Sequence, residues 1–326
     1  MIAFLLVLLA AIGGSNYVLT PKLDPVYREK KDSIDVMFFG SSMCYCTFDV
    51  PLLWKEYGIP SYNMGKQQQP PSLTYYTMKD ILKDQHPKVI VLELYGFSYQ
   101  VDNPEQVSPG VTGASLDIMR LSQCKTDAIM ANVPQKSKWI EYQIPFIRTH
   151  IGWKTLSLSS FTGVDSLNYK GFASYFKGVS SHKPDQKILN NQQKKIGTAQ
   201  KEYLNKIIDL TKSENIPLVL VKAPYPIRTD VVEVTNSIRE IARQNNIPLI
   251  DYTKKFNEIN FDFKQDTRDG QHLSSLGAEK LTRNLGEYIR TNYHLDSKEG
   301  QDDYKTWDGV TQLYYQTRGK EVKPAP

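Results

Sequence analysis

The chain has 326 residues, enough to bury the core of one large domain or two small ones. Its formal net charge of +5 is small and charges of both signs are mixed, so the composition gives no indication of nucleic-acid binding. The three cysteines, Cys44, Cys46 and Cys124, are too few for a disulfide framework, and no histidine or second cysteine pair stands at zinc-binding spacing. No phosphate-binding or dinucleotide motif is visible, and we expect neither a metal nor a cofactor.

Residues 1–20 contain no charged side chain. The apolar core, Ile2 to Ile12, is shorter than the about 20 residues that a bilayer span requires, but the stretch from Gly13 to Leu19 extends it to that length. No basic residues precede it, and no clear cleavage site follows. We therefore expect an uncleaved membrane anchor with the rest of the chain outside the cytoplasm; the alternative is a buried helix of the domain.

The chain then alternates between predicted strands and helices. A short helix is predicted from the capping residue Asp49, with Pro51 in its first turn, to Gly58. Longer helical segments are predicted at 72–85, 198–211, 231–244 and 275–293. Apolar runs typical of buried strands lie at 34–39, 59–64, 89–94, 216–221 and 247–251. Right-handed crossovers between such units imply an α/β fold, a doubly wound five-stranded parallel sheet of flavodoxin-like order 2-1-3-4-5.

This alternation breaks between residues 100 and 197, where proline, glycine, serine and asparagine are frequent. We expect an insertion of short helices that covers the carboxyl edge of the sheet. Within it, Arg148, His150 and Trp153 are grouped, either as substrate contacts or as packing residues of a helical cap. After the main domain, 33–295, we expect a polar tail at 296–326, whose aromatic residues are possible docking points: Trp307, Tyr314 and Tyr315.

Two motifs carry candidate chemistry. The first strand is followed by Gly40-Ser41-Ser42, which places a serine hydroxyl at the sheet edge where open α/β proteins have their sites. Far downstream, Asp269 and His272 are three residues apart, a spacing that puts both on one face of a helical turn. The aspartate could orient the imidazole, and the imidazole could take the proton of Ser42. Lys222, at the end of the fourth strand, is either a substrate contact or a solvated lysine.

At these positions the sequence resembles the SGNH (GDSL-like) hydrolase superfamily, over about residues 33–293 without the insertion. Gly40 to Met43 resembles its first block, Asn63-Met64-Gly65 its second and Asp269 to His272 its last. The resemblance implies that Ser42 is the nucleophile, with His272 and Asp269 as its catalytic partners. It also implies that the N–H groups of Ser42 and Gly65 form the oxyanion hole.

The third block of that superfamily contains an asparagine that completes the oxyanion hole, and this chain departs from it. After the third strand the sequence reads from Glu93 to Gln100 without an asparagine, so Ser98 or Gln100 could replace the missing donor. Losing one such donor costs about two to three orders of magnitude in rate.

The chain also resembles divergent, membrane-anchored members that modify the cell envelope: alginate and peptidoglycan O-acetyltransferases and the D-alanyl transfer protein. This implies hydrolysis or transfer of an acyl ester, chiefly an acetyl ester, on an envelope polysaccharide, with a membrane-bound acyltransferase as a possible partner. The alternative is a non-catalytic envelope-assembly factor that binds a polymer or such an acyltransferase.

Overall fold

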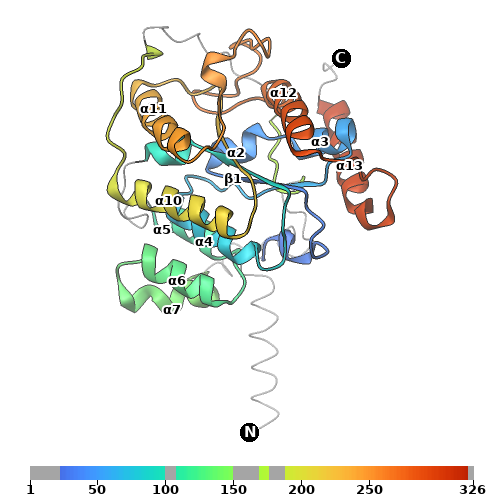
Figure 1. The fold of residues 1–326 in the computed structure, drawn as a ribbon. Coiled ribbons are helices and arrows are strands. Elements are labelled where there is room, and N and C mark those ends of the chain that lie inside the picture. Colours follow the sequence, from blue (N-terminus) through green and yellow to red (C-terminus); the bar gives the residue numbers. More distant parts are fainter. Residues whose placement is uncertain (1–22, 100–107, 150–168, 176–187, 322–326) are drawn as a thin grey trace.

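The computed structural model describes residues 23–99, 108–149, 169–175 and 188–321. Its centre is a parallel sheet in the order β2-β1-β3-β4-β5, which confirms the predicted fold class and strand order (Figure 1). β1, β3 and β4 are buried along their whole length, as their continuous apolar sequences require. The strands are β1 (Val36–Phe39), β2 (Ser61–Asn63), β3 (Val89–Glu93), β4 (Leu218–Lys222) and β5 (Leu249–Asp251).

Helices form layers on both faces of the sheet. α4 and α10 pack against each other below it in the view of Figure 1, while α2, α3 and α12 lie together above it. α11 makes the crossover from β4 to β5. These helices are α2 (Ser42–Thr47), α3 (Val50–Tyr57), α4 (Pro71–Ile81), α10 (Thr198–Ser213), α11 (Thr229–Gln244) and α12 (Ser275–Tyr293). Short 3-10 turns lie at Pro25–Arg28 (η1), Tyr95–Ser98 (η2), Lys136–Lys138 (η4), Tyr252–Lys254 (η7) and Asp302–Tyr304 (η8).

α3 shows how local sequence sets the ends of an element. The Asp49 side chain accepts the N–H of Leu52 at 2.9 Å and caps the helix, as predicted. Gly58 ends it with a φ of 62°, and a Cβ there would overlap Ser297, so no other residue fits. Both ends of α3 are therefore determined by residues that the sequence already indicated.

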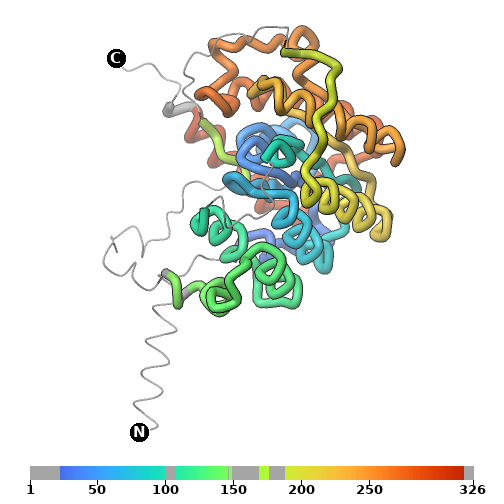
Figure 2. The backbone as a smooth tube through the Cα atoms, turned by 90° about the vertical axis from the view of Figure 1, so that its left-hand side faces the viewer, coloured from blue at the N-terminus to red at the C-terminus, as the bar shows by residue number. Residues whose placement is uncertain are grey.

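The described helices of the insertion lie on the outer side of α4. Leu73 of α4 joins Leu116, Ile129 and Tyr142 in a separate apolar cluster, and Figure 2 shows the segment 108–149 as an additional layer. This placement differs from the expected cover over the carboxyl edge, because α4 presents an apolar outer face that these helices bury. They are α5 (Pro109–Leu116), α6 (Gln123–Asn132), α7 (Trp139–Gln143) and α8 (Phe146–Thr149).

Most of the predicted polar tail folds into a helix, α13 (Lys305–Glu321), that packs on α3. Trp307 is buried and donates from Nε1 to the C=O of Ser61 at 3.0 Å. The hydroxyl of Tyr314 is buried as well and lies 2.9 Å from Oδ2 of Asp49. The aromatic residues that were possible docking points for a partner thus dock within the chain itself.

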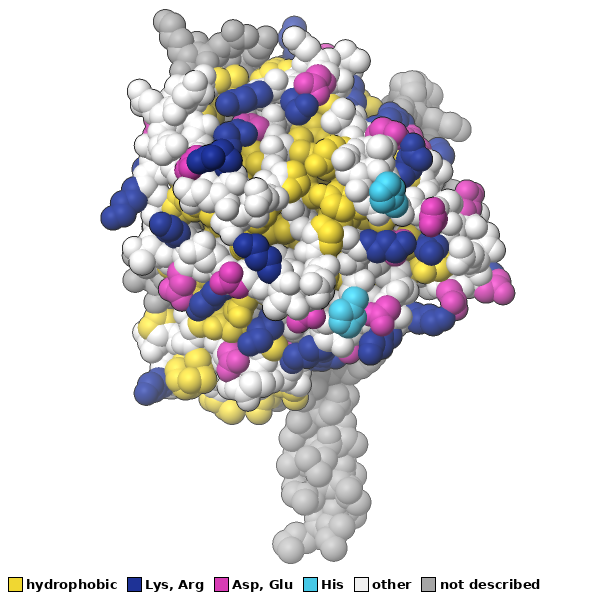
Figure 3. Space-filling view, in the orientation of Figure 1, with side chains coloured by type: hydrophobic (Ala, Val, Ile, Leu, Met, Phe, Trp, Pro, Cys, Tyr) yellow, Lys and Arg dark blue, Asp and Glu magenta, His cyan; other side chains and the backbone are white. Residues whose placement is uncertain are grey.

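Among residues 23–99, 108–149, 169–175 and 188–321, no helix is both long and apolar enough to cross a bilayer. The anchor expected at 1–20 lies outside these ranges. In the view of Figure 3, basic and acidic side chains are interspersed over the visible face, as the mixed charge of the sequence predicts.

Candidate active site

Ser42 lies where β1 meets α2 at the carboxyl edge of the sheet. Gly40 makes the turn with a φ of +150°, and a Cβ on it would lie only 3.0 Å from Cβ of Glu93 in the neighbouring strand. Ser41 then caps α2, its hydroxyl accepting the N–H of Met43 at 3.4 Å. This turn directs the chain away from the sheet immediately before Ser42, which becomes the first residue of the helix.

His272 reaches Ser42 from the loop that precedes α12. A bridge between Thr267 and Leu273 closes this loop, and the N–H of Arg268 donates to the C=O of His272 at 2.8 Å. Nε2 of His272 lies 3.0 Å from Oγ of Ser42. The imidazole therefore meets the hydroxyl with the nitrogen that a general base uses.

Asp269 holds the other side of the imidazole. Its Oδ2 lies 3.0 Å from Nδ1 of His272, and its Oδ1 accepts the backbone N–H groups of Gln271 and His272 at 2.7 Å each. The predicted helical turn is wrong here: the aspartate folds back through a side-chain-to-backbone turn in a loop. The spacing of three residues is nevertheless what allows one carboxylate to bind both the backbone and the ring.

The charge state of Asp269 follows from these bonds. Burial alone would raise the pKa of its carboxyl group, but the hydrogen bonds from His272 and Gln271 outweigh it and lower the pKa. An ionised Asp269 fixes the proton on Nδ1 and leaves the Nε2 lone pair for the hydroxyl of Ser42. Asp266, three residues earlier in the sequence, is buried and ion-paired with Lys280 at 2.7 Å, so it does not serve this role.

Of the two N–H groups predicted to form the oxyanion hole, one is bonded within the chain. Gly65 lies tightly against α2, and its N–H donates to Oδ1 of Asn63 at 3.0 Å, so it is not available to a substrate. Ser98 is engaged as well, its hydroxyl donating to the C=O of Tyr95 at 2.7 Å, and Gln100 lies outside the described residues. The N–H of Ser42 has no acceptor in the part of the chain that the structure describes.

Gln69 is a polar residue of this region that the sequence did not single out. Both polar atoms of its side chain are buried and have no hydrogen-bond partner among the described residues. The backbone C=O of Gln69 lies against Gly96: a Cβ built on Gly96 would be 2.9 Å from that oxygen. The same Cβ would be 3.8 Å from Cβ of Ser41. A buried carboxamide without partners among the described residues is costly and calls for an explanation.

Lys222 is buried and not solvated. It is 1% exposed at the end of β4, and its Nζ donates to the C=O of Ala223 at 2.7 Å. Burial lowers its pKa, and the charge of the neighbouring Glu93 opposes this. Glu93 is buried too; burial raises its pKa to about 7, partly offset by Lys222. These two residues support the strand ends beneath Gly40.

Of the three substrate contacts predicted in the insertion, the structure describes one, Arg148. Arg148 forms an ion pair with Asp117 and lies over the ring of Tyr142 at 5.0 Å, so it holds the insertion helices together. His150 and Trp153 lie outside the described residues.

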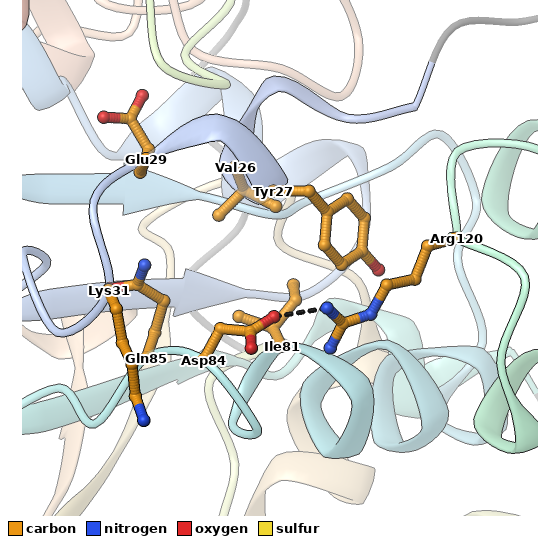
Figure 4. Close-up of a pocket in the computed structure, with 8 residues that line it drawn as sticks. All are labelled: Val26, Tyr27, Glu29, Lys31, Ile81, Asp84, Gln85 and Arg120. Carbon is orange, nitrogen blue, oxygen red and sulfur yellow. Dashed lines mark hydrogen bonds and ion pairs between the residues drawn. The ribbon is translucent and has the colours of Figure 1, made fainter.

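A pocket is present at the opposite edge of the sheet, near the end of α4, where an ion pair joins Arg120 to Asp84 (Figure 4). Because Ser42 and His272 lie at the carboxyl edge, this pocket is separate from them. Its lining residues are Val26, Tyr27, Glu29, Lys31, Ile81, Asp84, Gln85 and Arg120.

Comparisons with known proteins leave the family unassigned. No protein family matches the sequence, and no curated protein does either. Solved structures with a similar course of the chain include the lipase/acylhydrolase from Enterococcus faecalis, at 13% identity, 82% coverage of this chain, 100% of that chain and a TM-score of 0.41. A putative lipolytic protein of the G-D-S-L family from Desulfitobacterium hafniense has 10% identity, coverages of 78% and 98%, and a TM-score of 0.39. A GDSL-like lipase from Bacteroides thetaiotaomicron has 14% identity, coverages of 82% and 91%, and a TM-score of 0.35. At these values the likenesses carry no functional argument, and the site must be judged on its own geometry.

Proposed function

We propose that the protein is a serine-dependent enzyme that hydrolyses or transfers an acyl group held in an ester. The observation that carries this proposal is the chain of contacts from Asp269 through His272 to Ser42, with 3.0 Å from Oδ2 to Nδ1 and 3.0 Å from Nε2 to Oγ. Three separate side chains in this order are what nucleophilic acyl chemistry requires.

The reaction follows in two steps. Nε2 of His272 takes the hydroxyl proton while Oγ of Ser42 bonds to the ester carbonyl carbon, and the imidazolium gives this proton to the departing alcohol as the carbon–oxygen bond breaks. Water or an acceptor hydroxyl then loses a proton to Nε2 and attacks the acyl-Ser42 ester. The acyl group leaves on the attacking oxygen, and Oγ regains its proton from His272.

The negative carbonyl oxygen formed in each step requires donors. We assign the N–H of Ser42 as the first and the carboxamide of Gln69 as the second, in place of the Gly65 N–H and the missing asparagine. The support is that the Gln69 carboxamide is buried without partners among the described residues and that the Gln69 backbone lies against Gly96, which faces Ser41. Gly65, by contrast, is already bonded to Asn63. A donor held ready in a buried site needs no rearrangement when charge develops.

Transfer to a polysaccharide hydroxyl of the cell envelope is the finer form of this proposal, with the chain anchored by residues 1–20 outside the cytoplasm. Its support is the sequence resemblance to envelope-modifying members. If Trp153 holds the acceptor sugar, Trp153→Ala should reduce transfer far more than hydrolysis of a small acetyl ester. Equal losses would instead assign Trp153 to the fold.

A non-catalytic envelope factor is the second candidate, and the bonded N–H of Gly65 favours it because one expected oxyanion donor is occupied. A fluorophosphonate probe decides between the two. The enzyme proposal predicts labelling of Ser42 that is absent in Ser42→Ala and lost in His272→Ala. Absence of labelling in folded wild-type protein would favour the binding factor.

A further inference from the structure

Arg268 belongs to the loop that carries both Asp269 and His272. Its N–H donates to the C=O of His272 at 2.8 Å, and its side chain is partly exposed. The guanidinium lies over the ring of Tyr175, with 3.3 Å between Cζ and the ring centroid. Stacking uses the flat face of the guanidinium and leaves its N–H edges for other partners.

No carboxylate of the residues that the structure describes occupies those edges. Asp269, the adjacent residue, directs its carboxylate to Gln271 and His272, and Arg268 forms no ion pair with any acidic residue in the described ranges. Most other arginines do form ion pairs with Asp or Glu, namely Arg120, Arg148, Arg228, Arg239, Arg243, Arg283, Arg290 and Arg318. Arg268 therefore retains a set of charged donors that fits a carboxylate or a phosphate.

A second tyrosine connects Arg268 to the nucleophile. Tyr45 is three residues after Ser42 in α2, so both lie on the same side of that helix. Burial raises the pKa of the Tyr45 phenol, Arg268 lowers it and Asp269 raises it, which places both charges within electrostatic reach of the ring. We call Tyr45, Tyr175 and Arg268 the arginine–tyrosine rim.

The segment 169–175 fixes the rim against the catalytic helices. The N–H of Ala173 donates to the C=O of Tyr45 at 2.9 Å, and the C=O of Tyr175 accepts the N–H of Ser275 at 2.9 Å. The segment that carries Tyr175 is thus bonded to both α2, which contains Ser42, and α12, which follows His272. The stacked guanidinium is held in place before any ligand arrives, which reduces the entropy lost on binding.

We propose that the arginine–tyrosine rim binds a carboxylate or phosphate group of the ester that Ser42 attacks. This inference rests on the proposed function and narrows its substrate class to anionic esters. The guanidinium edges take the charged oxygens, and the exposed parts of the two rings cover the uncharged part next to them.

Three acetyl esters of matched size test the inference: para-acetoxybenzoate, para-acetoxyphenyl phosphate and the neutral methyl para-acetoxybenzoate. We expect a higher kcat/KM for at least one anionic ester than for the neutral one, and the two anionic arms separate carboxylate from phosphate recognition. Arg268→Gln should lower kcat/KM for the preferred anionic ester about tenfold more than for the neutral one, mainly through KM.

Two further variants make the comparison specific. Arg268→Lys should restore part of the preference, because it keeps the charge but not the paired donors. Arg243→Gln is the matched control, since Arg243 lies at the far end of α11 and, among the described residues, forms an ion pair only with Glu240. It should change neither kinetic constant. Equal losses on charged and neutral esters in Arg268→Gln, or no loss at all, would overturn the inference.

A binding measurement distinguishes failure of this inference from failure of the proposed function. Calorimetry with Ser42→Ala and para-acetoxyphenyl phosphate or para-acetoxybenzoate measures recognition without catalysis, and Arg268→Gln in the same background should weaken binding of the preferred ester about tenfold. A protein that binds the anion through Arg268 but never hydrolyses an ester would refute the proposed function alone. An active esterase without any charge preference would refute the anionic subsite alone.

Discussion

Nε2 of His272 and Oγ of Ser42 lie 3.0 Å apart although 230 residues separate them in the sequence. The sheet topology produces this contact, because β1 ends beside the loop that follows β5 and enters α12. The helices α2 and α12 also pack on each other and hold the two residues at one edge.

Asp269 should contribute to rate and little to folding. We expect Asp269→Asn to lower kcat on an acetyl ester by about four orders of magnitude, because the imidazole loses the carboxylate that fixes its tautomer. Asp266→Asn is the control: it removes the buried negative charge that pairs with Lys280 and should cost about 1–3 kcal/mol of unfolding free energy. If Asp266→Asn lowers kcat and Asp269→Asn does not, the assignment of the aspartate is wrong.

Gln69→Leu distinguishes an oxyanion donor from a structural residue. We expect kcat to fall about a hundredfold with little change in KM, and the free energy of unfolding to stay the same or rise, since an unpaired buried amide is removed. Urea denaturation and steady-state kinetics measure the two effects.

Gln85→Leu is the matched control for Gln69→Leu. Gln85 is buried but bonded to the N–H of Ser33 and the C=O of Lys30, so its loss should cost about 1–3 kcal/mol without a specific loss of kcat. A Gln69→Leu protein that is destabilised yet keeps its kcat would show that Gln69 serves the fold.

Glu93 makes stability depend on pH. Burial raises its pKa from 4.5 to about 7, so the folded state favours the protonated acid. The resulting stability is fully present below the unfolded pKa near 4.5 and is lost as pH rises through the folded value near 7. Between these values, Glu93→Gln should therefore gain about 1–3 kcal/mol of unfolding free energy relative to the wild type.

Lys222 opposes the stability gain expected for Glu93→Gln, because that variant leaves the buried ammonium of Lys222 without the charge of Glu93, which is costly. The double variant Glu93→Gln/Lys222→Met removes both charges and should show the flattest pH profile of unfolding free energy. A wild-type profile that rises between pH 4.5 and 7 relative to both variants would contradict the assignment.

The helix α13 should be part of the cooperative fold. Trp307→Ala removes a fully buried ring and its bond to Ser61, and should lower the unfolding free energy by about 3–5 kcal/mol. Leu313→Ala, on the same helix but 43% exposed, should change it by less than about 1 kcal/mol. Similar small effects of both would mean that α13 is only loosely attached.

The sheet could be predicted from the sequence because its strands are continuous apolar runs and its crossovers have one hand. The predicted strands begin up to two residues early, since Ile34 and Ile59 are buried but precede the paired backbone. Ser42 and His272 could be found because their motifs lie at the ends of regular elements. The contact between their side chains is seen only in the structure.

The other differences between the sequence-based predictions and the structure come from contacts between residues far apart in the chain, which a local sequence pattern does not indicate. Gly65 loses its N–H to the side chain of Asn63, Lys222 is buried with Glu93, and Arg148 pairs with an aspartate of a different helix. α13 was missed because its polar surface outweighs two buried aromatic residues in composition. No sequence pattern indicated Gln69, because a buried amide can be recognised as unpaired only when the positions of the neighbouring residues are known.

The most direct test of the central claim is detection of an acyl group on Ser42. Wild-type protein is mixed with an acetyl ester, quenched in acid within the first turnover, and digested for mass spectrometry. We predict an acetyl group on Ser42 in the wild type, none in Ser42→Ala and a strongly reduced amount in His272→Ala. Absence of acetyl-Ser42 in folded, wild-type protein across neutral and anionic esters, or equal acetylation in His272→Ala, would contradict the proposed catalytic role.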